Sequence, residues 1–125
     1  MIAVDSSTWV AFLEGDSGDD IQLLDEALTD HQVLLPPAVL SELLSDPRLP
    51  ARIEKILLTL PLIEIEEGYW QRVGRLRARL LAKKRRARLG DALIAQSCLD
   101  RGIALLTRDR DFRAFAETVG LALVI

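Results

Sequence analysis

Short apolar runs alternate along the chain with longer segments of amphipathic pattern. The runs lie at residues 2–4, 33–35, 62–65, 104–106 and 121–124, and each has the length and composition of a buried strand. Between them, apolar residues recur at helical spacing, which predicts helices over about 6–14, 19–30, 37–44, 50–60, 67–86 and 90–101, with a short helix after 112. Strands joined by helices pair in parallel through right-handed crossovers. The pattern therefore predicts an α/β fold, a three-layer α/β/α sandwich around a central parallel sheet of about five strands.

Residues with known terminal preferences mark several helix ends. Ser6 or Ser7 is suited to cap the first helix, and Pro37 to occupy the first turn of the third. Gly90 and Asp91 open the predicted helix that Gly102 closes. Two aromatic residues, Tyr69 and Trp70, start the long helix and are candidates for a dimer or partner surface.

Length and composition predict one domain over residues 1–125. Half of the residues are hydrophobic and 28% are charged, a balance typical of a packed globular chain. The single cysteine, Cys98, cannot form an internal disulfide, so the sequence does not require an oxidising compartment. The start of the sequence lacks the pattern of a signal peptide, and no run reaches the roughly 18 apolar residues of a membrane span. We therefore expect a cytoplasmic protein without a membrane segment.

Charge is distributed unevenly, although the net charge is only −3. Residues 1–47 contain no Lys or Arg, whereas residues 72–88 contain nine basic residues and no acidic one. Such a segment can supply a local phosphate-binding field despite an acidic total. It can equally be a solvated helix face that balances the acidic half, and the sequence alone leaves both interpretations open.

Four acidic residues fall where an α/β fold forms its sites. Asp5 follows the first predicted strand and Asp109 follows the fourth. Glu42 lies in the helix after the second strand, on the edge of an apolar stripe, and Asp91 lies in the first turn of the helix before the fourth strand. Because the carboxyl ends of parallel strands form a crevice at a switch in strand order, we expect these acids to converge there.

Converging carboxylates of this kind predict a hard divalent cation. Inward-pointing acids repel one another and are costly unless they are paired, protonated or metal-bound. All-oxygen ligands suit Mg²⁺ or Mn²⁺, whereas Zn²⁺ prefers His or Cys, and the chain offers only His31 and Cys98. Such an ion can activate water and orient a phosphodiester, so the pattern favours a nuclease.

Each acid also has an ordinary structural explanation. Asp5 or Asp91 can cap a helix, Glu42 can lie on the surface, and Asp109 can form an Asx-turn. A phosphoaspartate enzyme is a weaker alternative, because Ser7 stands where a second Asp is expected and residues 103–125 contain no Lys. A dinucleotide-binding domain is weaker still, since no G-x-G-x-x-G follows the first strand.

At these acids the sequence resembles the PIN-domain ribonucleases, and among them the VapC-type toxins of toxin–antitoxin pairs. The resemblance covers essentially the whole chain. It rests on four segments, of which the last two are the most specific: Val4-Asp5-Ser6-Ser7, Leu40-Ser41-Glu42-Leu43, Gly90-Asp91-Ala92-Leu93-Ile94-Ala95 and Leu105-Leu106-Thr107-Arg108-Asp109-Arg110-Asp111-Phe112.

The resemblance implies a Mg²⁺- or Mn²⁺-dependent endoribonuclease that forms a homodimer and is silenced by a cognate antitoxin protein. It implies catalytic roles for Asp5, Glu42, Asp91 and Asp109, with Asp5, Asp91 and Asp109 as the metal ligands. Hydroxyl or carboxylate groups of secondary importance are Ser6, Thr107 and Asp111, and residues that could contact RNA phosphates or an antitoxin carboxylate are Arg85, Arg86 and Arg88. The alternative is a non-catalytic PIN-like module that only binds protein or RNA.

Overall fold

A parallel sheet forms the centre of the structure, a computed structural model that describes residues 1–124. Strands β1 (Ile2–Val4), β2 (Val33–Leu34) and β3 (Ala104–Leu106) pair in the order β2-β1-β3. In this register Ile2 lies opposite Val33 on one side and Ala104 on the other. The first strand of the chain is therefore the middle strand of the sheet.

The other two predicted strands take part in the sheet through single parallel bridges. Leu62 pairs with Leu35, and Leu123 pairs with Leu105, so each segment adds one bridge instead of a full strand. In residues 62–65 only Ile63 reaches the core, while Leu62 and Ile65 are 47% and 41% exposed. An edge segment with one buried side chain has little to hold a longer ladder in place.

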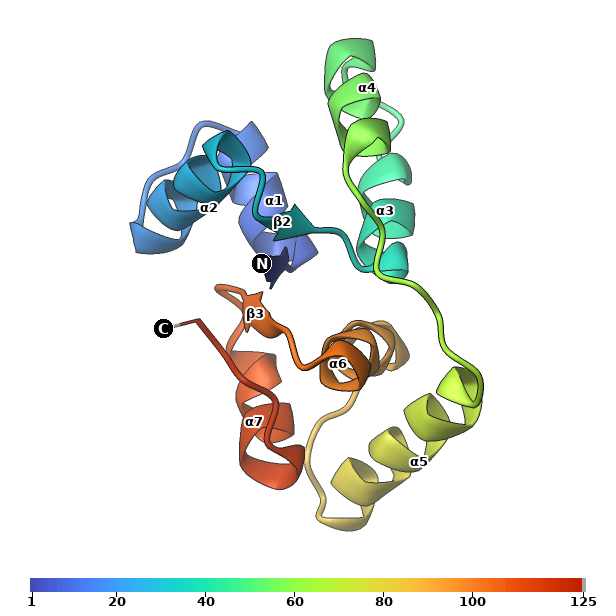
Figure 1. The fold of residues 1–125 in the computed structure, drawn as a ribbon. Helices are drawn as coiled ribbons and strands as arrows, with labels where there is room; N and C mark the ends of the chain where they lie inside the picture. The colour runs from blue at the N-terminus through green and yellow to red at the C-terminus, as the bar shows by residue number, and fades with distance from the viewer. Residues whose placement is uncertain (125) are drawn as a thin grey trace.

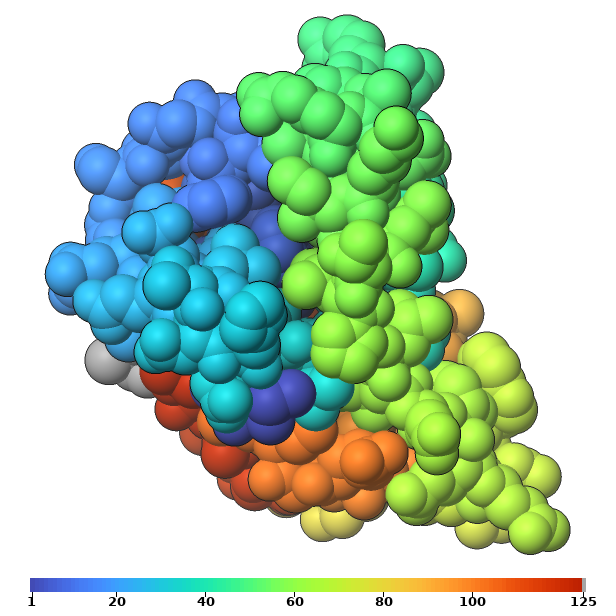
Figure 2. Space-filling view, turned by 45° about the horizontal axis from the view of Figure 1, so that its top comes forward, coloured from blue at the N-terminus to red at the C-terminus, as the bar shows by residue number. Residues whose placement is uncertain are grey.

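Helices cover both faces of the sheet, as the sequence predicts. Over residues 1–124 they are α1 (Ser6–Leu13), α2 (Asp19–Thr29), α3 (Pro37–Leu44), α4 (Ala51–Thr59), α5 (Tyr69–Ala82), α6 (Leu89–Arg101), the short 3₁₀ helix η1 (Arg110–Phe112) and α7 (Arg113–Val119). Figure 1 shows α1 and α2 on one side of the strands and α5 to α7 on the other, while α3 and α4 lie beyond β2, with α3 in contact with both α1 and α6. In Figure 2, the green helix α4 stands out beside the blue N-terminal helices. The three-layer α/β/α fold class is confirmed.

Two helix starts differ from the sequence prediction. Asp5, and neither Ser6 nor Ser7, caps α1, because its carboxylate accepts the backbone N–H of Ser7 at 3.3 Å. Helix α6 begins one residue earlier than expected, at Leu89 with Arg88 as its N-cap, and Asp91 lies in its first turn, as predicted. The prediction that Gly102 ends this helix is confirmed, and its φ of +62° is one that glycine adopts without strain.

The long charged helix is shorter than predicted. Helix α5 ends at Ala82, and Lys84 turns the chain with a φ of +57°. The following loop is tied down by Ala87, which is buried and whose carbonyl accepts a 2.7 Å hydrogen bond from Arg77 Nε. Residues 83–88 therefore form a fixed basic loop that leads into α6.

The core fills the space between the sheet and the helices. Its largest fully buried side chains include Phe112, Phe115 and Ile94. Tyr69 is also buried and donates its hydroxyl to the carbonyl of Leu93 at 2.6 Å, so the prediction that it lies on a partner surface is wrong. Trp70 is 66% exposed. In the described part of the chain, no helix is both long and apolar enough to cross a bilayer.

Candidate metal centre and active site

Asp5 lies at the carboxyl end of the central strand and is only 3% exposed. Its Oδ2 accepts hydrogen bonds from the Ser7 hydroxyl at 2.6 Å and the Thr107 hydroxyl at 2.9 Å, besides the backbone N–H of Ser7. Oδ1 has only a long contact from the Ser6 hydroxyl at 3.5 Å. The capping role suggested for Asp5 is therefore present, and it uses one oxygen while the other remains nearly free to bind a ligand.

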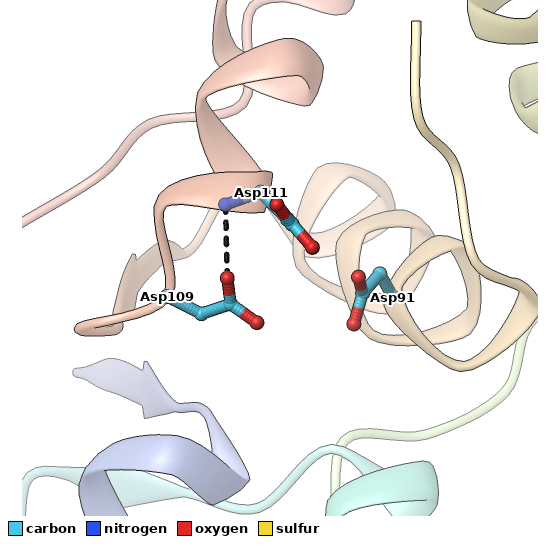
Figure 3. A group of neighbouring side chains, drawn as sticks. All are labelled: Asp91, Asp109 and Asp111. Carbon is cyan, nitrogen blue, oxygen red and sulfur yellow. Dashed lines mark hydrogen bonds between the residues drawn. The ribbon is translucent and has the colours of Figure 1, made fainter.

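A second group of acids gathers where α6 begins and β3 ends. Carboxylate oxygens of Asp91, Asp109 and Asp111 all lie within 4.8 Å of one another (Figure 3). Asp109 caps η1 by accepting the backbone N–H of Asp111 at 2.9 Å, and its own N–H is bound by the Thr107 hydroxyl at 3.0 Å. The turn predicted as the ordinary role of Asp109 thus brings Asp111 into the group.

Asp91 carries the clearest electrostatic signature of the site. Burial, and then the charges of Asp109, Asp5 and Asp111, together raise the pKa of its carboxyl group to about 6, against a lowering contribution from Arg88. Its neighbours at helical spacing on the same face, Ile94, Ala95 and Cys98, are all buried. An acid pressed between an apolar face and other acids gains most from a bound cation.

Glu42 approaches the group from α3. It accepts a 3.1 Å hydrogen bond from the Ser6 hydroxyl, which also contacts Asp5. Loss of hydration raises the pKa of Glu42, the Ser6 hydrogen bond lowers it, and the charge of Asp5 raises it again. Its side chain is nevertheless exposed, so Glu42 lies at the open rim of the site.

One open cavity of about 400 Å³ connects these residues. All four acids predicted from the sequence line it, together with Ser6, Ser7, Val10, Leu43 and Arg88. Asp5 and Glu42 border the cavity without joining the tight group of three carboxylates, whereas Asp111 joins that group. The residues present fit a hard divalent cation, because every clustered donor is a carboxylate oxygen, while Cys98 is buried with its pKa raised to about 12.

The basic residues singled out in the sequence have different partners. Arg85 forms a 2.8 Å ion pair with Glu117, away from the acids. Arg86 and Arg88 approach Asp111 Oδ2 at 3.7 and 3.9 Å. Only these last two therefore meet the acidic group.

Two residues of this region were missed by sequence reasoning. Ser7 donates to Asp5, and its position two residues after a capping Asp is the signal that could have identified it. Arg108, between Thr107 and Asp109, turns away from the cavity and binds Asp16 and Asp20. Nothing in the local sequence indicates that Arg108 binds these two acids instead of those of the cavity.

Comparisons with known proteins show the family of the chain and agree with its fold. The sequence matches the PIN domain family over residues 2–118, so the chain belongs to the PIN domain family. The structure is similar to a chain of VapBC2 from Rickettsia felis bound to a DNA fragment from their promoter, with 22% identity, 99% of this chain and 98% of that chain covered, and a TM-score of 0.74. It is also similar to VapBC-5, of the VapBC family of toxin–antitoxin systems, from Mycobacterium tuberculosis, with 22% identity, 98% of this chain and 96% of that chain covered, and a TM-score of 0.69. A third similar structure is VapBC-1 from nontypeable Haemophilus influenzae, with 14% identity, 99% of this chain and 97% of that chain covered, and a TM-score of 0.75. No curated protein matches the chain.

Proposed function

We propose that this protein is a Mg²⁺- or Mn²⁺-dependent endoribonuclease of the VapC type, the toxin of a toxin–antitoxin module. The observation that carries the proposal is the cluster of Asp91, Asp109 and Asp111, whose carboxylate oxygens lie within 4.8 Å of one another, beside an open cavity that Asp91 and Asp109 line. Membership of the PIN domain family supports a nuclease at this position. The whole chain, residues 1–125, acts as one domain in this proposal.

Asp5, Asp91 and Asp109 would hold the cation, and Glu42 would complete the catalytic acids at the rim. When bound, such a cation lowers the pKa of water and neutralises charge on a phosphodiester. Thr107 positions two of these acids, because its hydroxyl donates to Asp5 and accepts the N–H of Asp109. Ser6 links Asp5 to Glu42, and Asp111 either shares a second ion or orders the loop.

The shape and charge of the cavity support RNA as the substrate. The cavity is open, so a flexible strand can lie across it, and Arg88 adds a positive charge at its wall. Arg86 lies beside the same acids through Asp111, while Arg85 is engaged by Glu117 and is the weakest of the three as an RNA ligand.

The toxin role is proposed from the kind of protein that shares this architecture. VapBC complexes align with nearly the full length of this chain. We propose a cognate antitoxin that binds beside the acids, where Glu42 also borders a groove of mixed apolar and charged residues that contains Val10, Leu13 and Ile53. Trp70, exposed beside Pro37 and Ile65, is a candidate for the homodimer surface. The cytoplasm is the expected location.

The direct test is cleavage of total RNA by purified, antitoxin-free protein in EDTA, Mg²⁺ or Mn²⁺. We expect cleavage only with a cation, and none by Asp91→Asn, while Asp25→Asn, which removes an exposed acid on α2, cleaves like the wild type. Intact RNA under every condition, with no cation binding by titration calorimetry, would refute the nuclease and favour the binding module.

A further inference from the structure

The ion pairs of Asp111 differ from the hydrogen-bonded arginine–carboxylate pairs of the described chain. Arg72 binds Asp100 at 2.6 Å, and Arg85 binds Glu117 at 2.8 Å, in each case with a hydrogen bond. Asp111 is approached by two guanidinium groups at 3.7 and 3.9 Å, the longest ion pairs between described residues, and neither is a hydrogen bond. The attraction is therefore mainly charge to charge and easily exchanged.

The backbone that presents these arginines is fixed, whereas their side chains are free to move. The loop of residues 83–88 is held by the hydrogen bond from Arg77 to Ala87 and by the N–H of Arg85 on the carbonyl of Leu80 at 2.9 Å. The side chains of Arg86 and Arg88 are 63% and 58% exposed. A phosphate in solvent can reach both of them without any change of fold.

We propose that Asp111 holds Arg86 and Arg88 while the acidic group lacks a cation, and that cation binding releases both arginines to bind an RNA phosphate. The inference rests on the proposed function, because it assigns an order of binding to that site. Three clustered carboxylates attract these two guanidinium groups as their nearest counterions. A divalent cation shared by the carboxylates supplies the same charge at shorter range, so the hold on the arginines weakens.

This exchange makes the binding of the cation and the binding of RNA favour each other. The cation raises the affinity for RNA, and RNA raises the affinity for the cation by the same factor, because coupling between two binding sites is reciprocal. Asp111 is a positioning residue here, because it acts through the two arginines, whereas the arginines themselves bind the substrate. We therefore expect the cation to bind before RNA, because RNA binds weakly to the cavity while the cation needed for cleavage is missing.

The first test removes the negative charge of Asp111 while no divalent cation is present. In EDTA, binding of a short fluorescein-labelled oligouridylate is followed by anisotropy for the wild type, Asp111→Asn and Glu117→Gln. Both variants lose one negative charge and free arginines of the same loop, so they are a matched pair. We expect Asp111→Asn to bind about threefold to tenfold more tightly, with a steeper salt dependence by up to about 1.4 in slope for two phosphate contacts, and Glu117→Gln to change less than about twofold. Equal gains, or no gain for Asp111→Asn, would overturn the proposal.

The second test removes the arginines. In a Glu42→Gln background, which suppresses cleavage if the proposed function is right and keeps the proposed ligands Asp5, Asp91 and Asp109, RNA affinity is compared with and without saturating Mg²⁺. We expect Mg²⁺ to raise affinity with Arg86 and Arg88 present, and to raise it several-fold less in Arg86→Gln/Arg88→Gln, with Mg²⁺ binding by calorimetry retained. An identical Mg²⁺ effect in the double variant would overturn the coupling. Failure of the proposed function shows separately, as wild-type protein that never cleaves RNA with either cation.

Discussion

Two groups of aspartates meet the loop after β3 through adjacent residues, Arg108 and Asp109. Arg108 binds Asp20 through Nε at 2.8 Å and Asp16 through Nη1 at 2.9 Å. Its side-chain hydrogen bond is the main reason why the pKa of Asp20 is lowered, and the pKa of Asp16 is lowered first by the backbone of Ser17 and then by Arg108. In the other group, the pKa of Asp91 is raised to about 6.

The two groups differ in the hydrogen-bond donors that surround the carboxylates, and not in the type of acid. Asp20 receives two guanidinium hydrogen bonds and one from the Thr8 hydroxyl, so folding already neutralises its charge. Asp91 has no hydrogen-bond donor to its side chain among the described residues, and it faces other carboxylates. One group therefore stabilises the junction of α1, α2 and β3, while the other keeps an unsatisfied demand for positive charge, which is the property of a cation site.

The largest effect expected from this comparison is on catalysis. Asp109→Asn should lower RNA cleavage by about 10³-fold or more, because a lost cation contribution of several kcal/mol corresponds to at least that factor. Asp20→Asn should leave cleavage per folded molecule unchanged. Initial rates of RNA cleavage at saturating Mg²⁺, normalised to the folded fraction from circular dichroism, check both outcomes. Equal losses in the two variants would erase the distinction between the groups.

Stability should respond in the opposite way. Asp20→Asn is expected to lower the free energy of unfolding by about 1–2 kcal/mol at pH 7, since it weakens charge-assisted hydrogen bonds to a partly exposed arginine. Because the pKa of Asp20 is lowered by folding, this stabilisation is present above the ordinary pKa of 3.8 and is lost as pH falls through the lower folded value. Urea denaturation at pH 7 and pH 3 measures the change.

In the absence of a metal, Asp91→Asn should have the converse effect and raise the free energy of unfolding. Folding raises the pKa of Asp91 from 3.8 to about 6, so the folded state binds the proton more tightly and wild-type stability falls as pH rises between these values. At pH 8 in EDTA, Asp91→Asn should be more stable than the wild type by about 1–2 kcal/mol. At pH 3.5 the gain should disappear. Asp25→Asn is the surface control, and a gain independent of pH would contradict the assignment.

The smallest effect concerns the hydroxyl that connects the acids. Thr107→Val removes the donor to Asp5 and the acceptor of the Asp109 N–H while keeping the shape of the side chain. Loss of such a supporting contact typically lowers activity about tenfold or somewhat more. Thr29→Val, at an exposed hydroxyl bound only to the carbonyl of Asp25, should have no effect on cleavage. Cleavage rates at several Mg²⁺ concentrations show whether the loss follows weakened cation binding.

Sequence reasoning anticipated the parts of the fold that local pattern controls. The apolar runs at Ile2–Val4 and Ala104–Leu106 form strands because their side chains are buried in the sheet, and Asp5 and Asp109 follow them. Residues 62–65 are also mainly apolar but lie at the edge of the sheet. There the packing against neighbouring segments, and not the local sequence pattern, determines how many bridges form. The end of α5 was misjudged because Lys84 adopts a positive φ without a glycine to indicate it.

Within the site, the sequence does not reveal which carboxylate oxygens are used by helix caps and which stay available for a ligand. The sequence offered capping and site roles for Asp5 and Asp109 as alternatives, and the structure shows caps that occupy only part of each carboxylate. The sequence analysis gives Asp111 only a secondary role beside Asp109, since spacing along the chain does not reveal that η1 brings both carboxylates close to Asp91. The outward turn of Arg108 depends on acids about 90 positions earlier, beyond the reach of local pattern.

The central claim is that the acids around Asp91, and not those around Arg108, bind a divalent cation. Anomalous diffraction from Mn²⁺-soaked crystals tests it most directly, because the ion locates itself without reference to activity. The account predicts an anomalous peak bounded by the carboxylates of Asp91 and Asp109, with Asp5 or Asp111 nearby, and none at Asp16 and Asp20. Crystals that bind no Mn²⁺ in the cavity, or bind it only at Asp16 and Asp20, would contradict the account.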